Sequence, residues 1–471
     1  MAEAPVLTPR ADDFPRRYQD LIAKAELADN APVRGTMVIR PYGYGPWERM
    51  QAETDARIKE TGTRNAYVPL LIPRSSLARE TDHVEGFAPG PAVVTHGGGK
   101  ELEEPAVVRP TSEMIANEYF AKWVQGYRDL PLLINQWADV VRWELRPRLF
   151  LRTTEFLWQE GHTAHATYEE ARDFAARVHR RVYEDFMVNV LAMDVVPGRR
   201  TAGERFADAI DTLTLEGMTG DGKALQMATS HELGQNFAKA FTTSFLSKDG
   251  RRKLVRQTFW GSTTRMIGGL VTMHGDDHGL RVPPRPAPVQ AVVLAIKGDE
   301  AVPAKAREAG DRLGAAGIRV RVHDRTDTPF GRRAVDGALK GVPVRVEIGP
   351  RDLENGTAML VRRIPGGKEQ VALDALAGRL PAVLEEDQAL LPGQARERRA
   401  SRTTGVSTLG EAVEVTTAGG WARIPWATLG ADGENALAEH AATVRCLVPE
   451  DGSVPEAEDA PGNVAVVARA C

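Results

Sequence analysis

Cysteine is almost missing from this chain of 471 residues: it occurs as Cys446 and as the last residue, Cys471. Two cysteines exclude a disulfide scaffold and a structural zinc site built from four thiolates. The start of the chain, MAEAPVLTPRADDFPRR, also lacks the apolar core of a secretory signal. A reducing cytoplasm is therefore the expected location.

Long apolar runs are missing as well. No stretch approaches the roughly 20 residues that cross a bilayer, so we expect no membrane partner. Hydrophobic residues make up 42% and charged residues 26% of the chain, which is enough for sizeable cores. A net charge of −4 argues against a surface that binds nucleic acid all over, but a local basic face is compatible with it.

Composition shifts predict three domains, at 1–284, 289–390 and 391–471. The four prolines of VPPRPAPVQ, from Val282 to Gln290, indicate a stiff linker after the first. Beyond it we expect an α/β domain with a largely parallel sheet. Its predicted strands and helices are Val289–Ile296, Ala301–Ala316, Ile318–His323, Val342–Ile348, Thr357–Arg362 and Leu373–Leu390.

The most informative segment is VVRWELRPRLFLRTTEFLWQEGHTAH, from Val140 to His165. It predicts two strands joined by a short loop. Because side chains alternate along a strand, Arg142 and Glu144 share a face. By the same rule one face of the return strand carries Arg152, Phe156, Trp158, Glu160 and His162. A solvated sheet face would favour Lys, Thr and Ser over aromatic residues interleaved with Arg, so we expect a binding site.

This spacing resembles the second motif of the class II aminoacyl-tRNA synthetases, with Arg142, Glu144, Arg152 and Phe156 in the matching positions. A site of that kind holds an α-phosphate, an amino-acid carboxylate and an adenine. Arg suits the two oxyanions because its planar fork binds them bidentately. A predicted helix from Tyr44 to Glu60, followed by a strand from Asn65 to Ile72 interrupted at Pro69, resembles the first motif, which builds the dimer interface in that family.

Three further segments carry polar residues in suggestive places. In VRPTSE, Thr111 and Glu113 face the same way if extended and could hold an ammonium, although a helix cap before Met114–Trp123 is an equal alternative. In QMATSHELGQNF, His231 alone would more often be structural. The stretch WGSTTRMIGGLVTMHG predicts a glycine turn and an apolar helix beginning at Arg265, whose N-terminus favours phosphate.

The first two of these segments resemble the proline-binding loop and the pocket-lining segment of prolyl-tRNA synthetases, with Gln226, Thr229 and His231 in place, and the third resembles a degenerate third motif. The whole chain is similar to the archaeal/eukaryotic-like type. The fold implied is α+β: a class II antiparallel sheet flanked by helices, then an α/β anticodon-binding domain and a small α+β C-terminal domain. Between His165 and Trp260 there is no room for an editing domain.

The resemblance implies a homodimeric proline–tRNA ligase that activates L-proline with ATP and charges tRNA(Pro). Arg142 and Arg265 would be catalytic. Proline would contact Thr111, Glu113, Arg142, Trp158, Glu160 and His231. ATP would contact Arg142, Glu144, Arg152, Thr153, Phe156, Gln226, Thr229, Thr263 and Arg265. Mg²⁺ would lie on the phosphates near Gln226, and Glu347 and Arg351 match the anticodon-facing loop.

Three alternatives remain at this stage. A related enzyme for threonine, serine or glycine is one, although a threonine enzyme needs a cysteine zinc ligand that the catalytic region lacks. A non-enzymatic paralogue would be expected to lose its arginines, and a pure nucleic-acid module leaves the proline pocket unexplained. A metal site at His274, Asp276, Asp277 and His278 is rejected, because these residues follow the helix instead of sharing one of its faces.

The tail departs most from the family, many of whose members carry a C-terminal zinc site with two cysteine pairs. The matching regions, Ala422–Asn435 and Pro449–Asn463, hold no cysteine, Cys446 matches a family cysteine beside the site, and His440 alone cannot replace the ligands. We expect an apolar cluster of Trp421, Ile424, Trp426 and Val444 instead.

Purified protein should therefore contain sub-stoichiometric zinc, and chelators should leave its activity unchanged. Elemental analysis of the dialysed protein tests this. One tightly bound zinc per chain would contradict the prediction and reveal a different ligand set.

Overall fold

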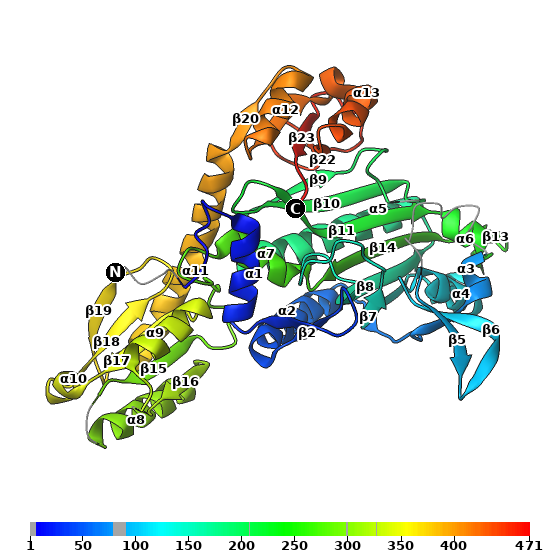
Figure 1. Ribbon diagram of the computed structural model, residues 1–471. Coiled ribbons are helices and arrows are strands. Elements are labelled where there is room, and N and C mark those ends of the chain that lie inside the picture. Colours follow the sequence, from blue (N-terminus) through cyan, green and yellow to red (C-terminus); the bar gives the residue numbers. More distant parts are fainter. Residues whose placement is uncertain (1–5, 79–90, 207, 298–299, 326) are drawn as a thin grey trace.

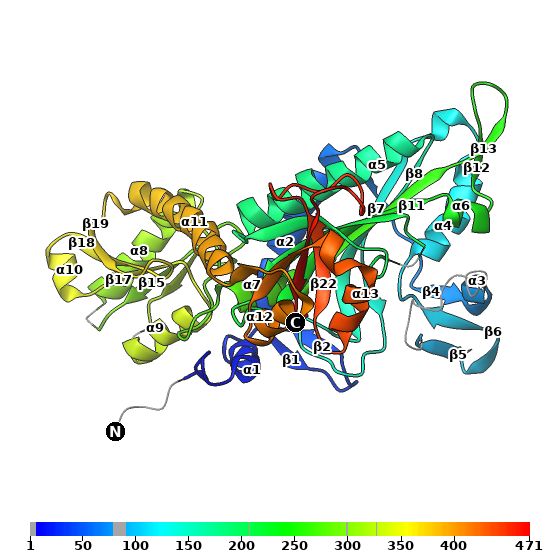
Figure 2. The ribbon, with the colours of Figure 1, turned by 90° about the horizontal axis from the view of Figure 1, so that it is seen from above.

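The computed structural model describes residues 6–78, 91–206, 208–297, 300–325 and 327–471. Figure 1 shows a long sheet with its helices, an α/β part on the left, and a smaller part above that carries the last strands; Figure 2 shows the same parts from above. In the described part of the chain, no helix is long and apolar enough to cross a membrane.

One large sheet organises the molecule. Its strands are β3 (Arg64–Asn65), β7 (Leu132–Val141), β8 (Glu155–His165), β9 (Val195–Arg199), β10 (Asp211–Met218), β11 (Ala224–Gly234), β14 (Arg256–Thr263), β20 (Thr403–Gly405), β21 (Trp421–Pro425), β22 (Thr443–Val448) and β23 (Val464–Ala468). The spatial order is β20-β21-β23-β22-β9-β10-β11-β14-β8-β7-β3. From β9 to β7 every pair is antiparallel, which confirms the expected sheet type.

Helices cover this sheet, and smaller strands extend from its end. The helices are α1 (Phe14–Lys24), α2 (Pro41–Glu60), α4 (Glu113–Trp123), α5 (Tyr168–Arg177), η2 (Val178–Glu184), η3 (Phe186–Val190) and α7 (Arg265–His274). The smaller elements are β1 (Ala28–Asn30), β2 (Met37–Ile39), β4 (Leu71–Pro73), α3 (Arg74–Ala78), β5 (Val93–Gly97), β6 (Lys100–Val108), η1 (Tyr127–Asp129), α6 (Asn236–Ala240), β12 (Ser244–Leu246) and β13 (Arg252–Leu254).

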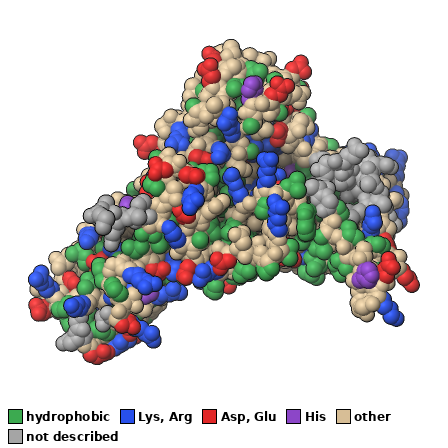
Figure 3. Space-filling model, in the orientation of Figure 1, with side chains coloured by type: hydrophobic (Ala, Val, Ile, Leu, Met, Phe, Trp, Pro, Cys, Tyr) green, Lys and Arg blue, Asp and Glu red, His purple; other side chains and the backbone are tan. Residues whose placement is uncertain are grey.

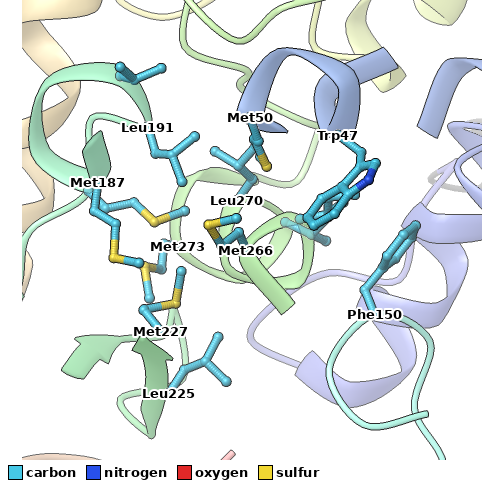
Figure 4. Close-up of a cluster of buried hydrophobic side chains, with 14 of the residues drawn as sticks. Trp47, Met50, Phe150, Met187, Leu191, Leu225, Met227, Met266, Leu270 and Met273 are labelled. Atoms are coloured by element: carbon cyan, nitrogen blue, oxygen red, sulfur yellow. The ribbon is translucent and has the colours of Figure 1, made fainter. Parts of the chain in front are cut away.

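The main core lies between α2, α7 and the β11 side of the sheet. Figure 4 shows Trp47 and Met50 of α2 facing the methionines of α7, with Met187 and Met227 on the opposite side. Flexible thioethers fill the irregular gaps between these elements. Gly43 is required where α2 meets the preceding segment, because an added Cβ would lie 2.1 Å from the Leu27 carbonyl oxygen.

The first-motif segment differs slightly from the prediction. Helix α2 begins at Pro41, three residues before Tyr44, because proline is favoured in the first turn of a helix. The strand from Asn65 to Ile72 is interrupted as expected, but over a longer stretch, with β3 ending at Asn65 and β4 beginning at Leu71. Pro69 lies in the gap, as its missing N–H donor requires.

The second-motif hairpin forms, but its strands are shorter than predicted. Strand β7 ends at Val141 and β8 begins at Glu155, so Arg142, Glu144 and Arg152 lie in the connection and not on strands. Beyond the strands, the Arg142 N–H donates to the Thr154 carbonyl oxygen (2.7 Å), and Arg148 forms an isolated bridge with Arg152. The chain then turns back with Phe150 at a φ of 62°, a left-handed conformation that no strand allows.

The α/β part contains five strands within the described residues, in the order β16-β15-β17-β18-β19. Its elements are β15 (Ala291–Ala295), α8 (Ala301–Ala315), β16 (Val320–His323), α9 (Phe330–Leu339), β17 (Val344–Ile348), α10 (Pro350–Glu354), β18 (Thr357–Arg362), β19 (Lys368–Ala372) and α11 (Leu376–Ser401). Only β16, β15 and β17 are parallel, so the expectation of a largely parallel sheet was wrong for β18 and β19. Residues 349–356 are too few for a parallel crossover, which needs about a dozen.

Helix α11 was predicted to end at Leu390 but continues to Ser401 and carries the chain into the last part (Figure 1). There, α12 (Leu409–Thr417) and α13 (Trp426–Ala438) pack on β20–β23. Strand β22 continues the large sheet through the pair Leu447 and Arg199. The last part is thus attached directly to the edge of β9.

The expected C-terminal apolar cluster is present except for one member. Ile424, Val444 and Trp426 pack together. Trp421 instead packs with Val196 and Cys446, and its indole N–H donates to the Gly222 carbonyl oxygen (3.1 Å). The prediction was wrong for Trp421 because a tertiary contact with the first domain, invisible in local sequence, buries it there.

Candidate active site

A cavity of about 430 Å³ opens beside the β7–β8 connection. Strands β8, β11 and β14, the N-terminus of α7 and the segment after β9 complete its walls. The predicted residues that line it are Arg142, Glu144, Arg152, Thr153, Phe156, Trp158, Gln226, Thr229, His231, Thr263 and Arg265. These residues lie far apart in sequence, so the fold itself assembles them.

A β-bulge puts the three β11 residues on one face. Thr229 and His231 pair with Thr214 and Thr212 of β10, and Gln226 pairs with Glu216 after a register shift. Directly paired residues project to the same side of a sheet. A regular strand would have turned Gln226 away, because it is three positions from Thr229, and the bulge returns it to the cavity.

His231 is a neutral, fixed group at the aromatic end of the cavity. Its Nδ1 lies 2.9 Å from the Thr212 hydroxyl, and its ring stacks on Phe259 at 5.4 Å. His162 stacks on the same phenyl ring at 5.2 Å. Burial, with a smaller contribution from Arg200, lowers the pKa of His231 to about 3. Its imidazole therefore offers hydrogen bonding and shape without charge.

Arg142 lies between an aromatic wall and two carboxylates. Its guanidinium is 5.0 Å from the Trp158 ring and 5.7 Å from the Phe156 ring, and its Nε donates to the Pro110 carbonyl oxygen (2.9 Å). Burial lowers the pKa of Arg142, while Glu113 and Glu160 act to raise it. The arginine stays cationic, with a fixed direction.

Glu160, whose charge acts on this arginine, is fully buried and does not line the cavity. It accepts hydrogen bonds from the Ser112 N–H (3.2 Å) and Gln136 Nε2 (2.7 Å), and His162 Nε2 lies 3.4 Å away. Burial acts to raise the pKa of Glu160, but its contacts with His162, Ser112 and Gln136 hold it at about 2. Glu160 is therefore ionised, and it positions neighbours from beneath the cavity lining.

Thr111 and Glu113 also lie beneath the lining and are buried. The segment is a helix start, since α4 begins at Glu113 with Ser112 at its N-cap, so the extended arrangement was wrong. Ser112 makes no side-chain capping bond, and its hydroxyl accepts from Gln136 instead (2.6 Å). Among the described residues, the Thr111 hydroxyl and the Trp158 indole N–H have no hydrogen-bond partner. Buried polar atoms left in this way are typical of a site that a ligand completes.

The third-motif residues meet the second motif at the other end of the cavity. Arg265 begins α7 as predicted, and its guanidinium donates to the carbonyl oxygens of Leu151 (3.1 Å) and Gln226 (3.4 Å). Burial lowers the pKa of Arg265, and the nearby Arg142 lowers it further. The expected glycine turn was wrong, because Gly261 lies inside strand β14.

Arg152 is the most exposed of the predicted ATP contacts, with 64% of its side chain accessible. Its Nε donates to Glu144 Oε2 (2.7 Å), so the two side chains form an ion pair with each other in this structure. Thr153 beside it is buried. This mouth of the cavity therefore carries a cation on a loop and neutral hydroxyls behind it.

Several lining residues were missed by the sequence analysis. They include Arg200, Glu204, Arg205, Phe206, Thr212, Phe259 and Ser262. Paired arginines and an aromatic residue in GRRTAGERF were the available signal, but no local period places that segment opposite β11. Their position depends on pairings made across the large sheet.

The remaining predicted residues lie away from the cavity. Glu347, buried on β17, accepts from Arg345 Nε (2.7 Å), and Arg351 is exposed on α10. At the rejected metal cluster, His274 Nε2 donates to the Leu191 carbonyl oxygen (2.9 Å) while Asp276 pairs with Arg363 (2.6 Å). In the described chain, no group of three His, Cys, Asp or Glu residues could hold an ion.

Comparisons with family models agree with this geometry. A model described as tRNA synthetase class II core domain (G, H, P, S and T) matches residues 95–274, and one described as anticodon binding domain matches residues 290–382. The antiparallel sheet, the cavity and these matches together define a class II aminoacyl-tRNA synthetase.

Individual relatives narrow the family. The chain is 82% identical to proline–tRNA ligase 2 of Streptomyces avermitilis over 470 residues, covering 100% of both, and 61% identical to proline–tRNA ligase of Frankia casuarinae, covering 98% of this chain and 99% of that one. A crystal structure of prolyl-tRNA synthetase from Cryptosporidium parvum, complexed with halofuginone and AMPPNP, superposes with a TM-score of 0.92 at 34% identity over 99% of each chain. The chain belongs to the prolyl-tRNA synthetase family.

Acid should destabilise the protein between about pH 6.5 and pH 4. Burial is the first cause that lowers the pKa of four histidines: His165 to about 4, and His179, His231 and His274 to about 3. Each histidine stays neutral in the folded protein but takes up a proton in the unfolded chain below pH 6.5. Each therefore lowers the free energy of unfolding by up to about 1.4 kcal/mol per pH unit as the pH falls.

Thermal unfolding followed from pH 7.5 to pH 4.5 tests this. His274→Gln keeps a donor for the Leu191 carbonyl and cannot be charged, so its melting temperature should fall less steeply. His96→Gln, at an exposed histidine, is the matched control. A pH-independent melting temperature in the wild type would contradict the expectation.

Proposed function

We propose that the cavity activates L-proline with ATP to prolyl adenylate and transfers the prolyl group to the 3′ end of tRNA(Pro). The observation that carries this is the position of Arg142, whose guanidinium stacks on Trp158 and Phe156 above two buried carboxylates. A cation in that position suits a carboxylate on one side and an α-phosphate on the other.

Proline would occupy the aromatic end. The rings of Trp158, His231 and Phe259 pack together there, and they would make a short pocket that accepts a five-membered ring and excludes longer side chains. Glu113 and the hydroxyl of Thr111 would hold the secondary ammonium. Glu160 would act from beneath, by fixing the loop through the Ser112 N–H.

ATP would occupy the opposite end. Phe156 offers an aromatic face to the adenine, with Arg265 across the cavity. Glu144, Thr153, Gln226, Thr229 and Thr263 would contact the base and ribose, and Arg152 would leave Glu144 for the phosphates. The relative complexed with AMPPNP supports a nucleotide at a site of this fold.

Mg²⁺ would accompany the phosphates. The cavity offers the carboxylate of Glu144 and the amide oxygen of Gln226. This set fits an ion carried mainly by phosphates and water and completed by one or two protein oxygens. When bound, the ion would offset charge on the leaving pyrophosphate.

The chemistry needs no protein nucleophile. The proline carboxylate attacks the α-phosphorus, the bond to the pyrophosphate oxygen breaks, and a tRNA ribose hydroxyl later attacks the activated carbonyl and releases AMP. Arg142 would neutralise charge shared by carboxylate and α-phosphate as it builds up. Alignment of two bound reactants supplies the rest of the acceleration.

The α/β part would bind the anticodon. Glu347 and Arg351 flank Gly349–Pro350, where β17 ends and α10 begins. Arg forks and carboxylates suit base edges. In this structure the Glu347 carboxylate accepts a hydrogen bond from Arg345. When tRNA binds, a base would replace Arg345 as its partner.

The chain would act as a homodimer in the cytoplasm. Five large apolar side chains of the 33–71 segment are exposed: Val33, Val38, Tyr44, Tyr67 and Leu71. Figure 3 shows apolar side chains gathered along the lower edge, where α2 and β2 lie in Figure 1. A second copy would cover such a patch.

Sedimentation at micromolar concentration should give twice the chain mass, and a monomer would contradict the proposal.

ATP–pyrophosphate exchange with each amino acid tests the function. Proline should support exchange, while threonine, serine and glycine should not. Arg142→Ala should lower the proline-dependent rate at least about 10²-fold, because it removes the group aimed at transition-state charge. Arg146→Ala, at an exposed arginine outside the cavity, is the matched control. Retention of exchange in Arg142→Ala within about threefold would contradict the role.

Charging of tRNA(Pro) should fall in the Glu347→Ala/Arg351→Ala pair, while exchange without tRNA persists. The two residues lie on a separate part of the chain, so they should affect tRNA binding alone. Glu354→Ala, exposed on α10, controls for the surface change. Loss of exchange in the pair would refute the separation of the two sites.

A further inference from the structure

The segment Arg199–Phe206, here called the 199–206 wall, closes one side of the cavity. Arg200, Glu204, Arg205 and Phe206 line it. Phe206 packs against His231 at 4.6 Å and Phe259 at 5.7 Å, so the wall covers the aromatic end. Displacement of the wall would therefore change the shape of the aromatic end before that of the rest of the cavity.

Besides the strand pair Leu447–Arg199, three side-chain contacts join the last part of the chain to this wall. Thr201 donates its hydroxyl to Glu434 Oε1 (2.5 Å), and Arg205 pairs with Glu458 Oε2 (2.7 Å). The Nε of Arg199 donates to the Pro455 carbonyl oxygen (3.0 Å). Charge-assisted bonds of this kind fix direction as well as distance.

A fourth contact passes through a buried carboxylate of the large sheet. Glu216 is fully buried and accepts from Arg200 Nη2 (2.8 Å) with one oxygen and from Arg445 (2.9 and 3.1 Å) with the other. Arg200 also reaches Glu204 (3.2 Å). Arg445, from β22, thereby sets how Glu216 holds the cavity cation Arg200.

We propose that Glu434, Arg445 and Glu458 are positioning residues for amino-acid binding: they hold the 199–206 wall against the aromatic end of the cavity from outside it. This rests on the proposed function, in which proline occupies that end. The C-terminal part thus shapes the amino-acid site without touching substrate, and the ATP end, whose contacts come from other elements, is independent of it.

Double-mutant cycles test the contacts that Glu458 and Glu434 make with the wall. Glu458→Gln should raise the KM for proline about two- to fivefold, the range that a partly exposed ion pair allows, and leave the KM for ATP unchanged. In an Arg205→Met background the same change should have no further effect. Glu434→Ala should behave likewise, alone and in a Thr201→Val background.

Matched controls are available on the same elements. Glu456→Gln lies in the same loop as Glu458 and Asp432→Ala on the same helix as Glu434; both residues are exposed, and in the described structure neither forms an ion pair. Both variants should keep wild-type KM values. Additive effects in the cycles, or equal rises in both KM values, would overturn the proposal.

Hydrogen–deuterium exchange separates this proposal from the function on which it rests. Without substrates, a peptide covering residues 199–206 should exchange faster in Glu458→Gln and Glu434→Ala than in the wild type or the controls. Unchanged exchange there would refute the positioning role whatever the enzyme activates. If exchange is faster in these variants but the wild type shows no proline-dependent activity, the positioning role would be supported and the proposed function refuted.

Discussion

The arrangement of this molecule depends on the hydrogen bonds that the buried carboxylate of Glu216 accepts. A lone charge with no accessible surface would be strongly destabilising, so its partners must be present whenever the protein is folded. Those partners are Arg200 beside the cavity, Arg445 from the last part of the chain, and the Thr214 hydroxyl (2.8 Å). The requirement joins the catalytic sheet, one cavity wall and the C-terminal strands into one unit.

The cavity combines fixed charges with fixed neutral groups. Glu160 stays ionised because donors surround it, while His231 stays neutral because burial penalises its charged form. Neither group needs to change protonation for an adenylation reaction. A site of this kind would act through prearranged electrostatics, and buried polar atoms without a partner, such as the Trp158 indole N–H, would bond to a ligand.

Much of this was predictable from local pattern. The alternation around Phe156, Trp158 and Glu160 gave the strand and its functional face, and Arg265 marked the start of α7 as expected. The β11 bulge that turns Gln226 into the cavity was not predictable, because it depends on the register with β10. The 199–206 wall was missed for a similar reason, since its partners lie more than 200 residues away. Trp421 had the right character for a core residue, yet sequence alone could not indicate which core it joins.

The attachment of β22 to β9 has a consequence for synthesis on the ribosome. Strand β9 would be an open sheet edge until residues 443–448 emerge and pair with it, late in translation. The carboxylates that hold the cavity wall, Glu434 and Glu458, also belong to the last part of the chain to be made. A nascent chain can therefore form most of its sheet early, but it completes the wall of its own catalytic cavity only when nearly the whole polypeptide has been made.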